Sequence, residues 1–558
     1  MSGQMYRFYV RLLIAVSFLT FLMSTPVVGK VIYVDDDANA PGDGKSWVTA
    51  YRYLQDALAD ARAADKPVEI RVAQGLYKPD ERANQTAGER EFQLISGVAL
   101  QGGYAGLGGP DPNVREIQLH RTILSGDLGG DDKDVNDLRD LLTRTGNSRT
   151  VVTCYQVDKT ALLDGVTITG GNYSIYSDFR PVGGGGIVIG DSDVTIANCT
   201  FTNNSAAQGG GAVLIRGGHP TFTNCTFTKN YAGSGGAIVG GDKGATITNC
   251  TFTGNGAYAG GAVAEYQGII SNCTFRGNSA ESGGGALNAC GGPITRCLFI
   301  NNSAGAYAGA LAVASRSGSA LITGCLFSHN TAGENGGAVD AAFLGDSLTF
   351  RSCVFDRNKA GGWGGGMFIH STPNAILVNC SFWANSATNG SGVTVYTWHP
   401  THPLSNLKLT NCILWDTGDE IWQNDKSTIN VRYSDVRGGY GGVGNIDADP
   451  LFADSNNADF HLKSQAGRWA PSSQRWVTDD VTSPCIDAGD PNSPIGYEPF
   501  PNGGRINMGA YGGTAEASKS YFGQLPCNAV IAGDINGDCK VDVVDLGLLA
   551  SHWLEIHP

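Results

Sequence analysis

The stretch Cys250-Thr-Phe-Thr-Gly-Asn255, followed by Gly260-Gly-Ala262, decides the fold, because it is one of eight copies of a single pattern. In every copy a phenylalanine stands two residues after the cysteine and an asparagine five residues after it, and successive cysteines are 23 to 28 residues apart. Such a period is typical of a solenoid, in which each repeat buries its apolar face against its neighbours. The copies begin at Cys199, Cys225, Cys250, Cys273, Cys297, Cys325, Cys353 and Cys380.

One copy contains three short strands separated by three bends. Val194 and Ile196 alternate with polar residues, and after a change of phase Cys199 and Phe201 alternate again. This alternation predicts strands with one face inward. No stretch of ten or more residues in the repeats has helical periodicity. We therefore expect an all-β fold, a right-handed parallel β-helix of about a dozen coils in which identical side chains stack.

The composition fits this fold and restricts the partners. The chain has 79 glycines and only 16% charged residues, as tight bends and closely packed coils require. Its net charge of −14 argues against nucleic acid and anionic membrane surfaces as partners. One cysteine per coil in the same inward position predicts a stack of free thiols. Isolated disulfides between adjoining coils are the alternative, because neighbouring coils bring Cα atoms within bonding reach.

The first 29 residues have the pattern of a secretory signal peptide. Arg7 and Arg11 supply positive charge, an apolar run extends from Leu12 to Met23, and small residues follow. A membrane anchor is the alternative, but the apolar run is short and no stop-transfer pattern follows it. We expect a secreted or cell-surface protein with no transmembrane segment after removal of the signal.

The rest of the chain divides into three units. We expect the β-helix over residues 30–444, with an N-terminal cap at 30–66 and the Cys-x-Phe-x-x-Asn coils at 194–412. Thr49 is placed to cap a helix that runs to about Ala64 and covers the open edge of the first coil. The polar segment from Asp127 to Ser148 is predicted to leave the rod as a loop. Residues 445–520 are rich in Pro, Asp and Ser, and residues 521–558 form the last unit.

The last unit contains a candidate calcium loop. Oxygen-bearing side chains occupy positions 1, 3, 5, 9 and 12 of a twelve-residue segment, and a backbone carbonyl is available at position 7, which is the ligand pattern of an EF-hand loop. A helix is predicted to follow from Leu546, and the alternative is an Asp-rich surface turn. Cys527 precedes this loop and Cys539 lies within it, outside the thiol stack, and they are the pair best placed for a disulfide. The predicted calcium ligands are Asp534, Asn536, Asp538, Lys540, Asp542 and Asp545.

The tail resembles one half of a type I dockerin. The shared residues are Gly533-Asp-Ile-Asn-Gly-Asp538, Val541-Asp542 and Asp545-Leu546 with the following helix. Dockerins attach secreted polysaccharide-degrading enzymes to cohesin scaffolds. The resemblance therefore implies calcium binding and a cohesin-like or cell-surface partner.

The other units also resemble known families. The repeated coils are similar to the polymorphic outer membrane protein repeats of bacteria and to the wider pectate-lyase-like β-helix superfamily. The segment from Tyr33-Val-Asp-Asp-Asp37 to Leu76-Tyr-Lys-Pro79 resembles the N-terminal cap of such secreted bacterial proteins. The block from Asp447 to Gly513 is similar to the choice-of-anchor Q domain, which lies between a β-helix and a surface-attachment tail. These resemblances imply a polysaccharide ligand.

A stripe of polar and aromatic residues marks the candidate ligand site. Alternation places it on the outer face of the third strand of each coil. Aromatic rings bind sugars by stacking on the apolar face of a pyranose. The predicted substrate-binding residues are Arg216, Tyr266, His370, Tyr396 and Trp398, and the catalytic candidates are His370 and Asp340. An ordinary solvated strand face is the alternative.

The sequence leaves catalysis open. The Asn-Thr-Asp, Asp-Asp and Gly-His-Gly motifs of polygalacturonase-type hydrolases do not occur in matching order, and no predicted strand has the Arg and Asp cluster of a pectate lyase. We expect a protein that binds polysaccharide, with degradation by a lyase or O-glycosyl hydrolase reaction undecided. The alternative is a non-catalytic surface or adhesin-type protein whose β-helix is a rigid spacer.

Overall fold

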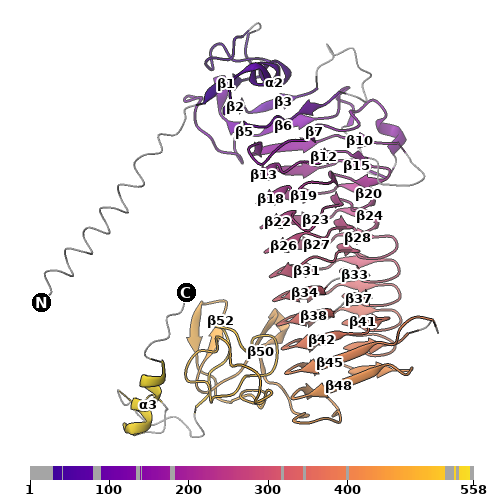
Figure 1. The fold of residues 1–558 in the computed structure, drawn as a ribbon, viewed down its shortest axis with the longest axis vertical. Helices are drawn as coiled ribbons and strands as arrows, with labels where there is room; N and C mark the ends of the chain where they lie inside the picture. Colours follow the sequence, from indigo (N-terminus) through magenta and orange to yellow (C-terminus); the bar gives the residue numbers. More distant parts are fainter. Residues whose placement is uncertain are drawn as a thin grey trace, which may run out of the picture.

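The protein is a rod of stacked coils with a smaller region packed beside one end (Figure 1). The computed structural model describes residues 29–39, 42–79, 90–132, 138–139, 141–175, 183–315, 319–343, 347–397, 401–521, 533, 535 and 540–552. The predicted signal peptide lies outside these residues, apart from Gly29. Every strand pair in the rod is parallel, and successive coils supply neighbouring strands of each sheet. The predicted parallel β-helix is confirmed.

Within the described residues, four parallel sheets run along the rod. The middle coils visit them in the order A, B, D and C, whereas the first and last coils have no strand in sheet D. Sheet A has 14 strands: β1 (Lys30–Val34), β2 (Val68–Ala73), β5 (Val98–Tyr104), β8 (Leu162–Asp164), β13 (Thr195–Ala197), β18 (Thr221–Thr223), β22 (Thr246–Thr248), β26 (Ile269–Ser271), β30 (Ile294–Thr295), β34 (Ser319–Thr323), β38 (Ser347–Arg351), β42 (Ala375–Val378), β45 (Asn406–Thr410) and β48 (Thr428–Arg432).

Sheet B has 13 strands: β3 (Gly75–Tyr77), β6 (Thr122–Ser125), β9 (Val166–Thr169), β14 (Thr200–Thr202), β19 (Thr226–Thr228), β23 (Thr251–Thr253), β27 (Thr274–Arg276), β31 (Leu298–Ile300), β35 (Leu326–Ser328), β39 (Val354–Asp356), β43 (Ser381–Trp383), β46 (Ile413–Trp415) and β49 (Asp435–Val436). Sheet D has eight short strands: β10 (Asn172–Tyr173), β15 (Ser205–Ala206), β20 (Tyr231–Ser234), β24 (Gly256–Ala259), β28 (Ser279–Ala280), β32 (Ser303–Ala304), β36 (Thr331–Ala332) and β40 (Lys359–Ala360).

Sheet C, which carries the candidate ligand site, has 12 strands: β4 (Phe92–Gln93), β7 (Val152–Tyr155), β12 (Ile187–Gly190), β17 (Val213–Arg216), β21 (Ile238–Val239), β25 (Val263–Ala264), β29 (Leu287–Asn288), β33 (Leu311–Ser315), β37 (Val339–Phe343), β41 (Met367–His370), β44 (Val393–Val395) and β47 (Ile421–Gln423). A two-stranded sheet of β11 (Gly183–Gly184) and β16 (Gly209–Gly210) accompanies the early coils.

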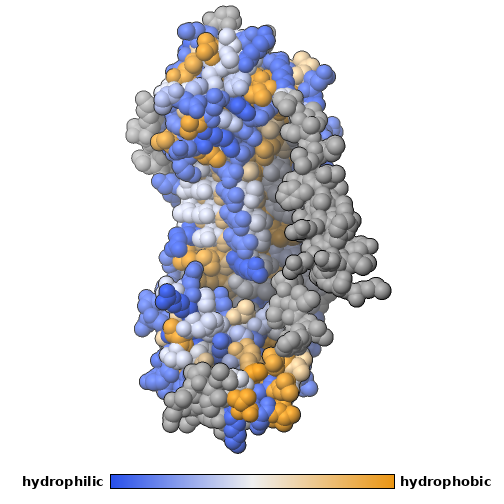
Figure 2. Space-filling model, turned by 90° about the vertical axis from the view of Figure 1, so that its left-hand side faces the viewer, coloured by the Kyte–Doolittle hydropathy of each residue, from blue (hydrophilic) through white to orange (hydrophobic). Residues whose placement is uncertain are grey.

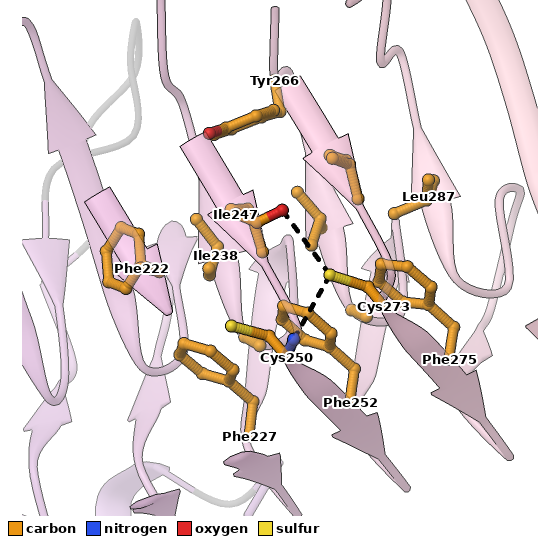
Figure 3. Close-up of a cluster of buried hydrophobic side chains, with 14 of the residues drawn as sticks. Phe222, Phe227, Ile238, Ile247, Cys250, Phe252, Tyr266, Cys273, Phe275 and Leu287 are labelled. Carbon is orange, nitrogen blue, oxygen red and sulfur yellow. Dashed lines mark hydrogen bonds between the residues drawn. The ribbon is translucent and has the colours of Figure 1, made fainter. Parts of the chain in front are cut away.

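Aromatic stacking fills the core. Phenylalanine rings of successive coils lie parallel, with centroids 4.4–5.0 Å apart and interplanar angles of 4–9°. This spacing is that of neighbouring strands in a sheet, so the repeat imposes it. The cysteines stack beside the rings, and Figure 3 shows Cys250 and Cys273 among them. The described cysteines of the rod are free and buried, as the repeat predicts.

Buried asparagines form a second column, which we call the asparagine ladder. Each side-chain amide donates through Nδ2 to Oδ1 of the equivalent residue one coil later, at 2.9–3.1 Å. The same Oδ1 also accepts the backbone N–H of the preceding ladder residue. The ladder thus satisfies buried polar groups at a bend, where strand pairing is interrupted. Its members are Asn204, Asn230, Asn255, Asn278, Asn302, Asn330, Asn358 and Asn385, and it ends on Asp416.

A helix covers the first coil, as predicted. Helix α2 (Leu54–Ala63) packs Leu54, Ala57, Leu58 and Ala61 into the core of the rod. Its start differs from the prediction, because its N-cap residue is Tyr53 and has no side-chain capping bond. Thr49 instead lies in the preceding turn, where its carbonyl accepts the backbone N–H groups of residues 43 and 44.

The region after the rod packs on the outer face of sheet B. It contains β50 (Phe452–Asp454) paired with β51 (Asp459–Leu462), and β52 (Arg468–Ala470) paired with β53 (Arg475–Val477). Phe452, Phe460 and Met508 form an apolar cluster with Val354 and Ile413 of the rod. The outward column of sheet B changes accordingly from threonine to mostly apolar residues along the rod, and its one later polar member, Ser381, accepts the backbone N–H of Ala510. In order, its members are Thr200, Thr226, Thr251, Thr274, Leu298, Leu326, Val354, Ser381 and Ile413.

Figure 2 shows the side of the rod near sheet A, where the middle of the molecule is narrow and mostly pale to blue. The hydrophilic stretch lies between the N-terminal end and the region packed on the later coils. Helix α3 (Val543–His552) is the helix predicted after the calcium loop. Among the described residues, no helix combines the length and apolarity needed to span a membrane.

Candidate functional site

A histidine–aspartate pair marks the outer face of sheet C at its later coils. Alternation in β41 turns Met367 and Ile369 into the core and leaves Phe368 and His370 on the other face. Asp340 stands on the preceding strand, β37, directly opposite Phe368. Nε2 of His370 lies 3.1 Å from Oδ1 of Asp340, and the two side chains are 14% and 9% exposed. The sequence-based placement of these two residues together is therefore correct in geometry.

Aromatic rings surround this pair, and we call Trp363, Phe368, His370, Tyr396 and Trp422 the aromatic face. The imidazole stacks on Phe368 with centroids 5.0 Å apart. The ring of Trp363 lies 6.1 Å from Phe368 and 5.9 Å from Tyr396, and Tyr396 lies 6.1 Å from Trp422. The indole and phenol rings are half-buried, whereas Phe368 is fully buried beneath its neighbours. Three partly exposed rings thus follow one another beside a polar pair.

Backbone register explains why these residues meet. His370 stands on β41, Tyr396 follows β44, and Trp422 lies on β47, which are the last three strands of sheet C. Trp363 comes from the bend that enters β41, where single parallel bridges continue from coil to coil. The rigid spacing of about 4.8 Å between strands fixes the distance between the rings. A flexible loop has no such constraint.

The prediction for Tyr266 is wrong, because this side chain is fully buried in the core. Figure 3 shows its ring inside the coil, above Ile247. The cause is Glu265, which has a left-handed backbone with φ 56° and ends β25 after two residues. Strict alternation therefore stops one residue before Tyr266, and the tyrosine turns inward.

The other predicted ligand residues fall in different places. Arg216 is exposed on β17, but five strands of sheet C lie between β17 and β41, so six strand spacings, or about 29 Å, separate the two strands. Trp398 lies outside the described residues. The sequence reasoning missed Trp422, whose signal was an outward position on a strand that pairs with the strand before Tyr396.

A second histidine lies next to the aromatic face. Nδ1 of His402 is 3.2 Å from Oγ of Ser371, the residue after His370. Ser371 is buried, and its φ of 52° belongs to the left-handed turn that ends β41. These contacts fix the loop beside the aromatic rings. The arrangement as a whole offers stacking surfaces and hydrogen-bonding groups at their edge, which is what holding a sugar chain requires.

The carboxylates of the acidic loop after β6 form hydrogen bonds and an ion pair within the described residues. In the loop after β6, Asp127 accepts the backbone N–H groups of residues 130, 131 and 132, and Asp132 pairs with the buried Arg144 at 2.8 Å. These carboxylates therefore stabilise the loop itself.

The predicted calcium loop is described only in part. Asp534, Asn536, Asp538 and the two flanking cysteines lie outside the described residues. Asp545 is 2% exposed, and its carboxylate accepts the backbone N–H groups of Ile535 and Asp542, each at 2.7 Å. This side chain thus faces the loop, which is the direction that the last ligand of such a loop must take.

Comparison with known proteins supports the architecture. Residues 164–317 match the family described as right handed beta helix region, and residues 346–489 match the family described as disaggregatase related. No curated protein matches the chain significantly. The crystal structure of pectate lyase Pel9A aligns over 86% of this chain and 96% of that chain, with 14% identity and a TM-score of 0.33. A likeness at this TM-score supports no conclusion about activity.

Proposed function

We propose that this protein is a secreted or cell-surface β-helix that binds polysaccharide through the aromatic face. The observation that carries the proposal is the row of half-buried rings Trp363, Tyr396 and Trp422 beside the His370–Asp340 pair. Each ring presents an apolar surface on which a pyranose stacks. The hydrogen-bonded pair supplies a polar group at the edge of the rings, where sugar hydroxyls lie.

The pair also defines what the site contributes beyond stacking. Asp340 accepts from Nε2 of His370 when this nitrogen carries a proton, which leaves Nδ1 as the other polar atom of the ring. Because both side chains are largely buried, their orientation is fixed before a ligand arrives. Preorganised groups bind more tightly than mobile ones, since less conformational entropy is lost.

A glycan array tests the proposal, with the mature chain as the probe. We expect binding to at least one extended polymer, and a loss of about tenfold for Tyr396→Ala and for Trp422→Ala, since a stacked aromatic ring contributes about 0.5–1.5 kcal/mol beyond the area it buries and tenfold corresponds to about 1.4 kcal/mol. Tyr258→Ala is the matched control, because Tyr258 is 59% exposed on sheet D, away from the aromatic face. Equal binding by all three variants, or no binding to any glycan, would contradict the proposal.

Product analysis on the same polymer decides between binding and degradation. Shortened or unsaturated products that disappear in His370→Ala would make the protein a hydrolase or a lyase. Intact polymer with undiminished binding in that variant would make it a carbohydrate-binding rod. A rod that binds no glycan would remain the structural surface protein that the sequence offered as the alternative.

We further propose that the tail binds calcium and serves for attachment. The support is the oxygen-ligand pattern of the segment and the inward orientation of Asp545. Calorimetric titration of the full chain with calcium should give one site, and Asp542→Ala should weaken it. Asp480→Ala, at an exposed carboxylate in the region beside the rod, is the control. An unchanged calcium affinity in Asp542→Ala would contradict this assignment.

A further inference from the structure

The asparagine ladder ends on a carboxylic acid, and this end lies next to the aromatic face. Oδ1 of Asp416 accepts the backbone N–H of Asn385 at 2.6 Å and its Nδ2 at 2.9 Å, as each ladder asparagine does for the one before it. Every ladder asparagine after Asn204 also donates through Nδ2 to a phenylalanine carbonyl, which for Asn385 is that of Phe355 at 2.8 Å. Asp416 has an oxygen, Oδ2, in place of this amino group.

Glu420 completes a buried acid pair with Asp416. Its Oε1 accepts the backbone N–H of Asp416 at 2.7 Å. Among the described residues, neither Oδ2 of Asp416 nor Oε2 of Glu420 has a donor partner, and the two residues are 0% and 4% exposed. Both oxygens point towards Gly392, where a Cβ would lie 2.8 Å from Oδ2 and 3.5 Å from Oε2. The two carboxyl groups are hydrogen-bonded to each other, which requires that one of them keep its proton.

Burial favours retention of that proton. Burial raises the pKa of Asp416 to about 7, and burial together with the neighbouring Asp416 raises the pKa of Glu420 to about 9. Because the two groups interact, these values describe the titration of the pair. The pair therefore holds a proton in the neutral range and loses it to solvent as the pH rises.

Other charged groups at this end do not replace the proton. Arg437 donates to the backbone carbonyl of Asp416 at 2.5 Å, and its charge lowers both pKa values. Asp419 is exposed on the same turn. Asp425, beyond β47, accepts from the backbone N–H groups of Thr397 and Ser427. Among the described residues, Arg437 is the cation that lowers the pKa values of the pair, and it bonds the backbone of Asp416.

The pair is joined directly to the strand that carries Trp422. Glu420 immediately precedes β47, and its carbonyl accepts the backbone N–H of Val393 on β44 at 2.9 Å. Strand β47 is the last strand of sheet C and pairs with β44 alone in that sheet. A three-residue strand at the edge of a sheet has few bonds of its own, so the turn from Asp416 to Glu420 determines its position.

We propose that the Asp416–Glu420 pair is a pH-sensitive latch for the aromatic face. With the shared proton, the turn holds β47 and Trp422 in place. Without it, two buried negative charges face each other, the turn opens, and Trp422 leaves the row of rings. The consequence for glycan binding rests on the proposed function, whereas the movement of Trp422 does not.

The movement is tested by ¹⁹F NMR of the full chain labelled with 5-fluorotryptophan, in which Trp422→Phe assigns the resonance. We expect this resonance to shift between about pH 6 and pH 9.5 in the natural chain and in the control Asp419→Asn. It should stay constant in Asp416→Asn and Glu420→Gln, which replace one acid by an amide donor of the same shape. A resonance that is constant in the natural chain, or that titrates equally in Glu420→Gln, would overturn the latch.

The binding test uses the polymer selected on the glycan array. Affinity should fall about tenfold between about pH 6 and pH 9.5 in the natural chain, because the competent fraction falls, and by less than about twofold in Glu420→Gln. A parallel fall in Glu420→Gln would overturn the regulatory role. If the Trp422 resonance shifts with pH as expected but no glycan binds at any pH, the proposed function fails and the latch stands.

Discussion

Asn278 lies in the middle of the asparagine ladder, and its replacement tests how strongly the ladder stabilises the rod. Its Oδ1 accepts the backbone N–H of Asn255 at 3.0 Å and Nδ2 of the same residue at 2.9 Å. Its Nδ2 donates to the carbonyl of Phe252 and to Oδ1 of Asn302, each at 3.0 Å. Alanine removes these four hydrogen bonds, whereas the bond from the backbone N–H of residue 278 to Asn302 remains possible.

The groups that alanine leaves behind determine the magnitude. The backbone N–H and one amide hydrogen of Asn255 lose their acceptor, and the carbonyl of Phe252 loses a donor. Each buried polar group left without a partner costs about 1–3 kcal/mol. The carbonyl of Phe252 keeps its strand bond from Arg276, so the two donor groups of Asn255 carry the cost. We therefore expect Asn278→Ala to lower the free energy of unfolding by about 2–6 kcal/mol, a large part of the stability of a typical domain.

The substitution Asn278→Asp makes the free energy of unfolding depend on pH. The second oxygen of the aspartate replaces the amino group and faces the carbonyl of Phe252 and Oδ1 of Asn302, so the folded state favours the protonated acid. The pKa in the folded state then lies above its unfolded value, and stability is lost as the pH rises from about 4 through the folded pKa. Asp416 has the equivalent position, where burial raises the pKa from 3.8 to about 7. A rise of this size corresponds to about 4 kcal/mol.

Guanidinium unfolding at several pH values, followed by circular dichroism and by fluorescence, measures both effects, and coincident curves establish cooperativity. Thr274→Ala is the matched control, because Thr274 lies in the same coil on the outer face and should change stability by less than about 0.5 kcal/mol. The reasoning is refuted if Asn278→Ala loses no more than this control. It is equally refuted if Asn278→Asp has the pH dependence of the natural chain.

Two further predictions concern buried groups elsewhere. The described cysteines of the rod are buried, so we expect thiol reagents to reach none of them in the folded protein and to modify all of them after unfolding. Mass spectrometry counts the modified thiols, and rapid modification of folded protein would contradict the buried stack. In the region beside the rod, burial raises the pKa of Glu498 to about 7, although its Oε1 accepts two backbone N–H groups. Stability should therefore fall as the pH rises from about 4.5 to about 7, and Glu498→Gln should reduce this fall in thermal melts at successive pH values.

The repeat predicts the coil because its constraints are local and recur. A phenylalanine two residues after the cysteine falls on its counterpart in the next coil whenever the strands pair in register, as Phe252 does on Phe275. A stacked pair in one register therefore favours the same register for the next coil. The capping helix is predictable for the same reason, since its apolar positions at Leu54 and Leu58 must cover an otherwise open coil.

The outer face is harder to predict, because no stacking constraint acts on it. A single left-handed residue, Glu265, reverses the direction of Tyr266, and the repeat has no fixed residue type at that point. The packing of residues 445–520 against the rod has a sequence signal, the change from threonine at Thr274 to leucine at Leu298. That signal shows which face is covered but not which segment covers it.

The titratable pair of Asp416 and Glu420 lies where the repeat ends, and the hydrogen bonding of the ladder explains why. Inside a ladder, every asparagine is donor to one neighbour and acceptor to the other, so each coil satisfies the next. The last member has no following coil of the same kind, and its hydrogen bonds must be completed by a group outside the pattern. Here that group is Glu420, paired with Asp416, and the result is a titratable site at the end of a ladder of neutral amides. Departures from the repeat at the end of a β-helix therefore indicate where protonation can be coupled to structure.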